Sequence, residues 1–233
     1  MEEINIENIK KLISEYTTFK DNYDIQNKKL AEGFNIFEIL KIETKETETH
    51  SPFIAHLLDP SEEHAQGDFF YKLFLETVIL DKITRDKFIN ADPKEYRVKL
   101  EEYAQGNEEE KGRMDISIES TSSRNQFAIV IENKINSSVH SFQLQKYYED
   151  RKRKYTDEKK LRIFYLTLNE ENMEGAFKDT AKQNELIEKG ILIPITYKKH
   201  IVMWLKKALE SKLPPRLDYI ICQYLSTLKT ISV

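Results

Sequence analysis

The sequence predicts an α/β domain in which a mixed β-sheet is flanked by helices towards both ends of the chain. Apolar residues recur at helical spacing through the first ninety residues, and from Tyr96 onwards they alternate with polar ones, as in strands. The central segments follow the order strand, strand, strand, helix, strand. A chain of 233 residues, 39% hydrophobic and 33% charged, holds enough apolar material for one core. We therefore expect a single domain over residues 1–233.

The N-terminal part, residues 1–95, is expected to be helical. Ser51 followed by Pro52 is typical of a helix start, with serine as the N-cap and proline in the first turn. Asp68 can cap the next helix. The helical spacing is carried by Ile4, Ile6, Ile9, Leu12, Ile13 and Tyr16, and later by Phe34, Phe37 and Leu40.

The remaining residues supply the sheet and its C-terminal cover. Alternation and β-branched residues indicate the strands, and polar clusters separate them. We expect residues 96–170 to hold most of the sheet and residues 171–233 to add a short strand and helices. The predicted elements are strands at 96–102, 114–119 and 127–131, a helix at 138–154, strands at 161–168 and 191–196, and helices at about 198–211 and 215–230.

Several function classes are excluded by composition. No two of the six glycines are closer than six residues, so a glycine-rich phosphate loop cannot form. The single cysteine, Cys222, excludes a disulfide framework, and we expect it to be buried and inert in an apolar helix. No apolar run approaches the length of a membrane span, and the first residues do not resemble a signal peptide. We expect a cytoplasmic protein that has no membrane partner.

The polar turn at residues 121–125 sets a register for the strands on either side. A symmetric hairpin about its centre places Asp115 opposite Glu132 and Ile116 opposite Ile131. Because side chains alternate between faces, the large apolar residues then fall on one face. Two carboxylates and the ammonium of Lys134 converge on the other.

These three groups can support hydrolysis of a phosphodiester. Two carboxylates at a cross-strand distance repel each other and raise each other's pKa unless a cation lies between them. Mg²⁺ prefers oxygen ligands and commonly takes one or two carboxylates together with water and substrate phosphate. Lys134 can orient or help deprotonate a water molecule there, or stabilise charge on a phosphoryl oxygen.

A structural explanation of the same pattern stays open. Glu-x-Lys occurs five times in the chain, and a solvated strand face with a cross-strand Glu–Lys pair is ordinary. The copy at residues 132–134 differs from the others because it ends a strand that lies opposite another acidic strand.

The motifs around these residues extend the pattern. Gly112-Arg-Met-Asp115-Ile-Ser-Ile, followed by Phe127-Ala-Ile-Val-Ile-Glu132-Asn-Lys134-Ile, resembles the Asp…Glu-x-Lys core of the PD-(D/E)xK nuclease superfamily. Three further stretches resemble a bacterial branch of that superfamily, and with the core they cover about residues 34–148. They are Asn35-Ile-Phe-Glu38-Ile-Leu, then Glu48-Thr-His50-Ser51-Pro-Phe-Ile-Ala-His-Leu-Leu-Asp59-Pro60 running into His64-Ala-Gln-Gly67-Asp, and finally Gln143-Leu-Gln-Lys-Tyr147.

The resemblance implies a restriction-endonuclease-like core of a helix, a three-stranded antiparallel meander, a helix and a strand, at residues 96–170, with extra N- and C-terminal helices. It implies Mg²⁺ as the cofactor, with Mn²⁺ as a substitute. Asp115, Glu132 and the Asn133 carbonyl would be metal ligands, and Lys134 the water-activating or charge-stabilising residue. Such nucleases often add a glutamate from an early helix, which maps best to Glu48, with Glu46 and Glu38 as close alternatives.

Further residues are candidates for substrate contact or for support of the site. Gln143 and Tyr147 lie four apart on one helix face, which either approaches the metal or simply packs on the sheet. Arg113 belongs to the first motif and His50 to the early stretch. Lys146 and Arg151 belong to the stretch 146–162, in which eight basic residues face four acids and tyrosines are interleaved. This stretch is either a nucleic-acid surface or a solvated helix end.

Charge is distributed unevenly, which affects the expected partner. The net charge of −4 by itself argues against a polyanion binder, but residues 1–145 carry −10 and residues 146–233 carry +6. The leading hypothesis is a metal-dependent nuclease, acting on DNA rather than RNA, in bacterial defence or DNA processing. The alternative is a catalytically silent nucleic-acid-binding or protein-interaction module on a nuclease-like fold. A homodimer through the terminal helices is also possible, and Trp204 lies in either the core or an association face.

Overall fold

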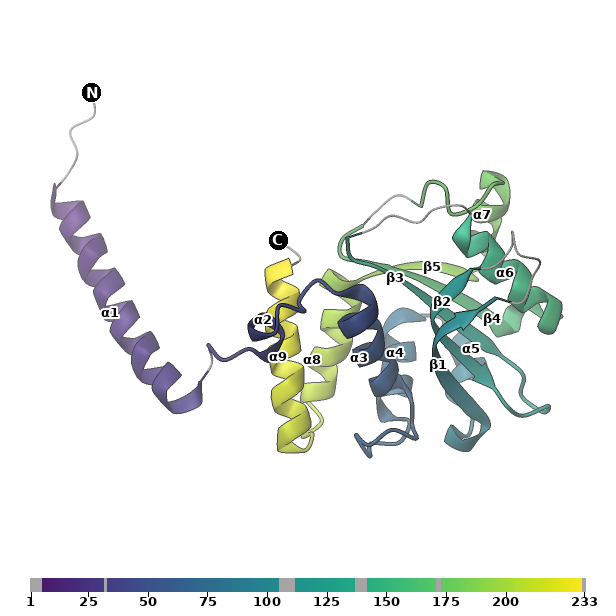
Figure 1. The fold of residues 1–233 in the computed structure, drawn as a ribbon, viewed down its shortest axis with the longest axis horizontal. Coiled ribbons are helices and arrows are strands. Elements are labelled where there is room, and N and C mark those ends of the chain that lie inside the picture. Colours follow the sequence, from purple (N-terminus) through teal and green to yellow (C-terminus); the bar gives the residue numbers. More distant parts are fainter. Residues whose placement is uncertain (1–5, 32, 105–111, 137–141, 171–172, 232–233) are drawn as a thin grey trace, which may run out of the picture.

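The computed structural model describes residues 6–31, 33–104, 112–136, 142–170 and 173–231 of the chain. Its body is a five-stranded mixed sheet with helices on both faces, and a long N-terminal helix stands apart from it (Figure 1). The predicted α/β class and mixed sheet are therefore confirmed.

The strands lie in the sheet in the order of the chain. They are β1 (Tyr96–Tyr103), β2 (Arg113–Ser120), β3 (Ala128–Lys134), β4 (Leu161–Thr167) and β5 (Leu192–Thr196). The first three strands form an antiparallel meander, and β4 and β5 then continue parallel to β3. The parallel connections run through α6 (Gln143–Lys154) and α7 (Thr180–Glu188), which lie on the same side of the sheet (Figure 1).

The opposite face carries the larger core. It is covered by α3 (Ser51–Leu58), α4 (Phe69–Val78), α5 (Lys82–Ile89), α8 (Val202–Leu209) and α9 (Pro215–Ile231). Trp204 of α8 is fully buried there, and its indole N–H donates a hydrogen bond to the Phe70 carbonyl at 3.0 Å. Trp204 thus belongs to the core and not to an association face.

Short helical segments complete the body. They are α2 (Ile36–Ile39), π-helical turns at Glu46–His50 and Tyr197–Ile201, and 3₁₀ turns at Pro93–Glu95 and Glu158–Lys160. The π-helical turn at Glu46–His50 runs directly into α3, so the helical conformation starts before Ser51. The prediction that Ser51 is an N-cap is therefore wrong, and its hydroxyl is available to a different partner.

The hairpin register is confirmed, because Ile116 pairs with Ile131. The expectation that large apolar residues fall on one face is wrong. Met114 and Val130 are buried on the α6 side, because the parallel crossover lays that helix over the same face. The simple alternation also breaks near Asp115, where Glu101 on the neighbouring strand adopts a left-handed conformation with φ 55°.

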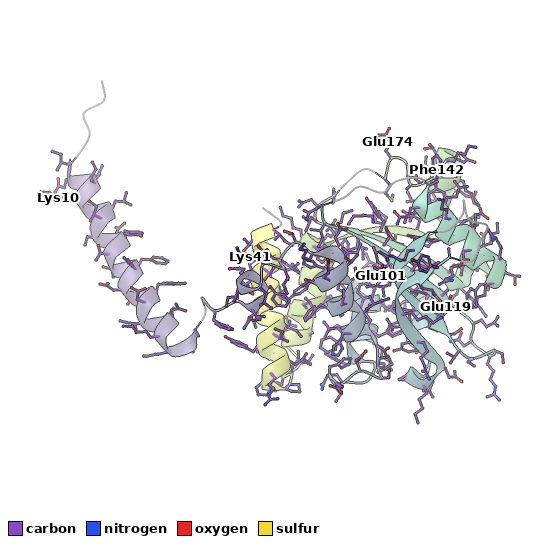
Figure 2. All side chains as sticks on the ribbon, viewed as in Figure 1. Lys10, Lys41, Glu101, Glu119, Phe142 and Glu174 are labelled. Carbon is purple, nitrogen blue, oxygen red and sulfur yellow. The ribbon has the colours of Figure 1, made fainter. Side chains whose placement is uncertain are left out.

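Helix α1 (Ile6–Leu30) has no buried residue and projects its side chains into solvent on all sides (Figure 2). The helix ends at Leu30, and the next residue, Ala31, has a left-handed φ of 51°. The Asn27 side chain then accepts a hydrogen bond from the Gly33 amide at 2.7 Å. The helix predicted for this segment is confirmed, and it is attached to the body only through its C-terminal end (Figure 1).

Other expectations differ from the structure in detail. Helix α6 starts at Gln143, and residues 138–141 of the predicted helix lie outside the described residues. No helix is predicted for residues 171–190, yet α7 forms there with Leu186 as its one fully buried residue. Cys222 lies on the exposed side of α9 and is not buried. Among the described residues, no helix combines the length and apolar character needed to cross a membrane.

Candidate active site

Two acidic side chains and a lysine meet at the C-terminal end of β3, where β2 begins. Asp115 is 8% exposed and Glu132 is completely buried. The Asn133 backbone N–H donates a hydrogen bond to Oδ2 of Asp115 at 2.7 Å. Nζ of Lys134 lies 2.6 Å from Oε1 of Glu132. The residues that the sequence places on one face are thus brought together.

The negative charges of this cluster are not fully balanced by positive ones. Burial raises the pKa of Glu132 to about 8, with a further contribution from the charge of Asp115, although Lys134 opposes both. Burial also raises the pKa of Asp115 to about 6, against the opposing hydrogen bond from Asn133. Burial lowers the pKa of Lys134, but the carboxylates of Glu132 and Asp115 outweigh it, so the net shift is upwards. One ammonium therefore serves two buried carboxyl groups.

This donor set fits a hard divalent cation. Oε2 of Glu132 is buried and accepts no hydrogen bond from the described residues, although the Tyr147 hydroxyl is near enough to affect its pKa. The carboxylates of Asp115 and Glu132 offer oxygen ligands, which Mg²⁺ prefers. No group of three or more His, Cys, Asp or Glu side chains with metal-binding geometry occurs among the described residues. Such a cation would thus keep several water ligands.

An open cleft of about 470 Å³ lies over the cluster, and two of the three candidate early glutamates line it. Glu46 and Glu48 both line it, together with Arg113, Lys134 and other residues. The charge of Glu46 contributes to the raised pKa of Asp115, and Glu46 accepts a hydrogen bond from the Asn136 backbone N–H at 3.4 Å. The Glu48 carboxylate is exposed and accepts a hydrogen bond from the Thr47 hydroxyl, which lowers its pKa.

Glu38, the third candidate, lies elsewhere. Its carboxylate accepts a hydrogen bond from Asn35 at 3.2 Å on α2, and it does not line the cleft. Of the three glutamates, Glu46 is the one whose charge acts on both Asp115 and Lys134.

The Asn133 side chain fixes the end of β3 from both sides. Its Nδ2 donates to the Ser51 hydroxyl at 3.0 Å, and its Oδ1 accepts from the Tyr197 hydroxyl at 2.9 Å. Sequence reasoning did not assign Ser51 or Tyr197 to the site. Ser51 resembled a helix cap, and nothing in the local pattern around Tyr197 indicated a contact across 64 positions.

His50 lies behind this arrangement and not in the cleft. One ring nitrogen is 2.7 Å from the Tyr224 hydroxyl, and the other is 2.9 Å from the Glu43 carbonyl oxygen. Burial lowers the pKa of His50 to about 4, so the ring is neutral at physiological pH. Its position suits a structural support of the π-helical turn that carries Glu46 and Glu48.

Helix α6 contributes the other predicted neighbours of the cluster. Gln143 lines the cleft, and its Nε2 donates to the Tyr147 hydroxyl at 2.7 Å. Tyr147 is buried and donates in turn to the Arg113 carbonyl oxygen at 2.6 Å. A Cβ added at Gly112 would lie 2.7 Å from the Tyr147 ring, so this glycine permits the close approach of strand and helix.

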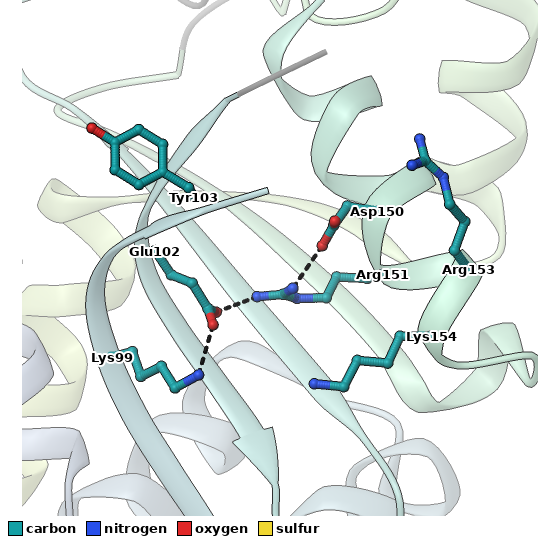
Figure 3. A pocket seen from close by; sticks show the side chains of 7 residues that line it. All are labelled: Lys99, Glu102, Tyr103, Asp150, Arg151, Arg153 and Lys154. Atoms are coloured by element: carbon teal, nitrogen blue, oxygen red, sulfur yellow. Dashed lines mark hydrogen bonds and ion pairs between the residues drawn. The ribbon is translucent and has the colours of Figure 1, made fainter. Parts of the chain in front are cut away.

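One turn further along α6, Arg151 lies in a second charged cluster (Figure 3). Its guanidinium forms ion pairs with Glu102, with Glu119 at 2.9 Å and with Asp150 at 2.6 Å. It also donates to the Ser117 hydroxyl at 2.8 Å, and only 5% of the residue is exposed. Arg151 is therefore occupied inside the protein.

The expectation of a basic, aromatic surface over residues 146–162 needs correction. The three tyrosines are buried, namely Tyr147, Tyr148 and Tyr155. Lys152 and Lys154 form ion pairs with Glu158 and Glu119. Lys146 remains at the surface, where it lines a cavity of about 340 Å³ beside Phe142.

The order of elements and the site define the class of protein. A three-stranded meander followed by a helical crossover to a parallel strand, with an Asp on β2 and Glu-x-Lys ending β3, is a restriction-endonuclease-like arrangement. The chain belongs to the PD-(D/E)XK nuclease superfamily, whose family model matches residues 34–226. Helix α1 lies outside the matched residues.

The other comparisons add little. No curated protein matches the chain. Among solved structures, the crystal structure of AF1548, a protein of unknown function, is similar at 14% identity with a TM-score of 0.29, covering 69% of this chain and 89% of that one. That likeness is too weak to bear on fold or function.

Proposed function

We propose that the protein hydrolyses phosphodiester bonds in DNA with the help of Mg²⁺. The observation that carries this proposal is the buried pair Asp115 and Glu132 with a single cation, Lys134, beneath an open cleft that Asp115 and Lys134 line. Structural ion-pair networks are normally closed by enough cations and hydrogen bonds. A buried pair with a charge deficit instead suits a site that receives a metal ion.

The residues of the chain have distinct tasks in this proposal. Asp115, Glu132 and the Asn133 carbonyl would hold the cation, which supplies charge neutralisation and activation of the attacking water when it is bound. The Asn133 backbone N–H keeps Asp115 oriented. The ammonium of Lys134 faces the cleft beside Glu132 and would stabilise negative charge that develops on a phosphoryl oxygen.

The cleft offers donors to a polyanionic substrate. Lys45, Arg113, Lys134 and Gln143 all line it. An open cleft of this kind admits a polymer backbone, whereas a closed pocket would select a small ligand. The setting we propose is bacterial defence or DNA processing in the cytoplasm, on the basis of the family.

Activity of matched variants tests the proposal. We expect the wild-type protein to cleave DNA in Mg²⁺ or Mn²⁺ and to stop in EDTA. The variants Asp115→Asn, Glu132→Gln and Lys134→Met should each lose at least about 10³-fold in rate, because electrostatic stabilisation is among the largest contributions to catalysis. Glu76→Gln removes an exposed carboxylate on α4 and should leave the rate unchanged. Circular dichroism confirms that each variant is folded.

The assay also separates the rival function. A catalytically silent module would bind nucleic acid in a salt-sensitive way without turnover, and its binding would not depend on Asp115. Cleavage of RNA in preference to DNA would overturn the choice of substrate. Wild-type rates in all three variants would overturn the catalytic site itself.

The third carboxylate is tested separately. We propose Glu46 for this place, since its charge acts on both Asp115 and Lys134, and Glu48 becomes the matched control from the same turn. Glu46→Gln should lower the rate by about 10- to 100-fold, as loss of supporting ligands commonly does. Glu48→Gln should have a smaller effect. The reverse order would return the assignment to Glu48.

We also propose that α1 pairs with the α1 of a second copy. Its large apolar side chains are exposed and gather along one side, with most steps three or four residues long, namely Ile6, Ile9, Leu12, Ile13, Tyr16, Phe19, Tyr23 and Leu30. This spacing is typical of a coiled-coil seam. An antiparallel pairing that superimposes Ile13 on Tyr23 places Lys10 of each copy near Asp24 of the other.

The molecular mass in solution tests this pairing. We expect light scattering to give twice the 27.6 kDa of the chain, and Ile13→Glu to give the monomer. Ile25 is equally exposed but lies on the opposite side of α1, so Ile25→Glu is the matched control and should stay dimeric. A monomeric wild-type protein, or equal dissociation by both variants, would contradict the pairing.

A further inference from the structure

Another buried charge, that of Arg162, lies far from the cleft, on the opposite face of the sheet from the Arg151 cluster. Arg162 is the second residue of β4 and pairs with Ile129, so it points to the side covered by α5. Only 3% of the residue is exposed. Its guanidinium lies over the Phe88 ring at 4.9 Å, and its Nη1 donates to the carbonyl oxygens of Leu161 and Lys159.

No carboxylate compensates this guanidinium. Among the described residues, none forms an ion pair with Arg162, and its buried Nε has no hydrogen-bond partner. Asp81 is the acidic residue that acts on its pKa, but the Asp81 carboxylate caps α5 by accepting from the Thr84 amide at 2.7 Å. Burial lowers the pKa of Arg162 to about 10, which leaves it charged at neutral pH. A buried charge in this situation is costly unless an anion accompanies it.

Arg162 lines a cavity of about 550 Å³ between α5 and the segment before β4. Lys87 and Lys159 line the same cavity, and neither forms an ion pair within the described part of the chain. Thr84 and Thr156 add hydroxyl groups to its wall. These residues supply three positive charges and two hydroxyl donors.

The acidic residues of the cavity wall are already in use. The Asp157 carboxylate accepts from the Lys159 amide at 3.1 Å. The Glu158 carboxylate accepts from the Tyr148 hydroxyl at 2.5 Å and forms ion pairs with Lys152 at 3.1 Å and Lys189 at 3.5 Å. Glu158 faces cations outside the group formed by Arg162, Lys87 and Lys159, and within the described residues Asp157 forms no ion pair with that group, so three positive charges against one carboxylate leave the group a net positive charge.

We propose that this cavity binds a phosphate group. A guanidinium with two ammonium groups and hydroxyl donors matches the charge and the several acceptor oxygens of a phosphate better than those of a single carboxylate. The cavity is larger than inorganic phosphate, so the natural ligand carries the phosphate on a larger body, either a nucleotide or a nucleic-acid strand. The site is independent of the nuclease proposal. Arg162 lies five residues from Thr167, which pairs with Lys134, or roughly 16 Å along the sheet.

Binding of inorganic phosphate in EDTA, followed by ³¹P NMR or calorimetry, tests the site without involving the catalytic metal. We expect saturable, salt-sensitive binding to the full-length protein. Lys87→Glu and Lys159→Glu should each weaken it at least tenfold, and Arg162→Met should abolish it. Lys82→Glu makes the same charge change on α5 outside the cavity, and it should alter the affinity less than twofold. Asp115→Asn should leave the affinity unchanged.

Competition then identifies the source of the phosphate. Displacement by adenosine monophosphate alone indicates a nucleotide site, and displacement by a short oligonucleotide indicates contact with a nucleic-acid backbone. Absence of saturable phosphate binding overturns the proposal. Equal weakening by Lys87→Glu and Lys82→Glu does so too, because it shows attraction to the surface in general. If Arg162→Met fails to fold, the two lysine variants decide the outcome.

Discussion

Helix α6 covers two charged clusters on the same face of the sheet, and they differ in how completely their charges are matched. Tyr147 approaches the cluster of Asp115, Glu132 and Lys134, whereas Arg151, one turn later, lies within the cluster of Glu102, Glu119 and Asp150. In the second cluster Lys99 and Lys154 add further cations (Figure 3). Three carboxylates there meet three cations, but two carboxylates meet one cation at the cleft.

The difference separates a cluster that is open to a ligand from one that is closed. Both clusters contain carboxylates that are less than a tenth exposed, so carboxylate burial alone does not distinguish them. The closed cluster satisfies its charges internally and fixes α6 on the meander. The open cluster leaves Glu132 with a pKa raised to about 8, which favours a ligand that brings positive charge. We therefore expect loss of the central cation to destabilise the protein at the closed cluster. Loss of a carboxylate should stabilise it at the open cluster.

Removal of the central cation from the closed cluster should have the largest effect on stability. Arg151→Met leaves Glu102, Glu119 and Asp150 without their shared partner, and breaking a buried pair costs about 3–5 kcal/mol. Urea unfolding in EDTA measures the loss. Lys152→Met, an exposed position on the same helix, should cost less than about 1 kcal/mol. Equal losses would show that Arg151 is not the centre of this cluster.

Removal of a charge from the open cluster should act in the opposite direction. The pKa of Glu132 is about 8 in the folded protein against an ordinary value of 4.5, so the unfolded chain ionises first as the pH rises. Stability that is fully present below pH 4.5 is therefore lost progressively towards pH 8. Glu132→Gln cannot ionise and should raise the free energy of unfolding by about 1–3 kcal/mol at pH 8 in EDTA.

The pH dependence of that gain provides the control. Near pH 4.5 the Glu132→Gln and wild-type proteins should unfold at nearly the same urea concentration, and added Mg²⁺ should stabilise only the wild type. A variant that is less stable than the wild type at pH 8 would refute the charge deficit at the cleft.

The smallest expected effect concerns the contact that sets α6 above the open cluster. In Gly112→Ala the new Cβ would approach the Tyr147 ring to 2.7 Å, and overpacking of this kind costs about 1–2 kcal/mol. Thermal unfolding measures the loss. The double variant Gly112→Ala with Tyr147→Leu should recover part of it, whereas purely additive losses would show that the two residues do not interact.

The sequence predicts the sheet well because its strands are strongly patterned. The centre of the polar turn is enough to obtain the pairing of Ile116 with Ile131. The second layer is harder to predict, since Val130 and Met114 become buried only when α6 is placed over them. The sequence pattern does not predict helix α7, because a helix that buries little apolar surface shows little hydrophobic periodicity.

The candidate site is only partly readable from sequence, for a related reason. The strands bring Asp115, Glu132 and Lys134 together, so the alternation of side chains along each strand is sufficient to group them. The choice between Glu46 and Glu48 depends on a π-helical turn, which gives no sequence signal. The role of Arg151 is misjudged because a basic residue on a helix has the same appearance whether it faces solvent or three carboxylates.

The Asn133 side chain connects α3 to the turn before α8 through Ser51 and Tyr197, which are 82 and 64 positions away along the chain. Contacts over such separations form late, since the loop between them must close before they contribute. The end of β3 that carries Glu132 and Lys134 is therefore completed only when both terminal parts of the body have docked. Recovered activity after refolding should lag behind the recovery of secondary structure, and a fragment limited to the sheet and α6 should lack a working site.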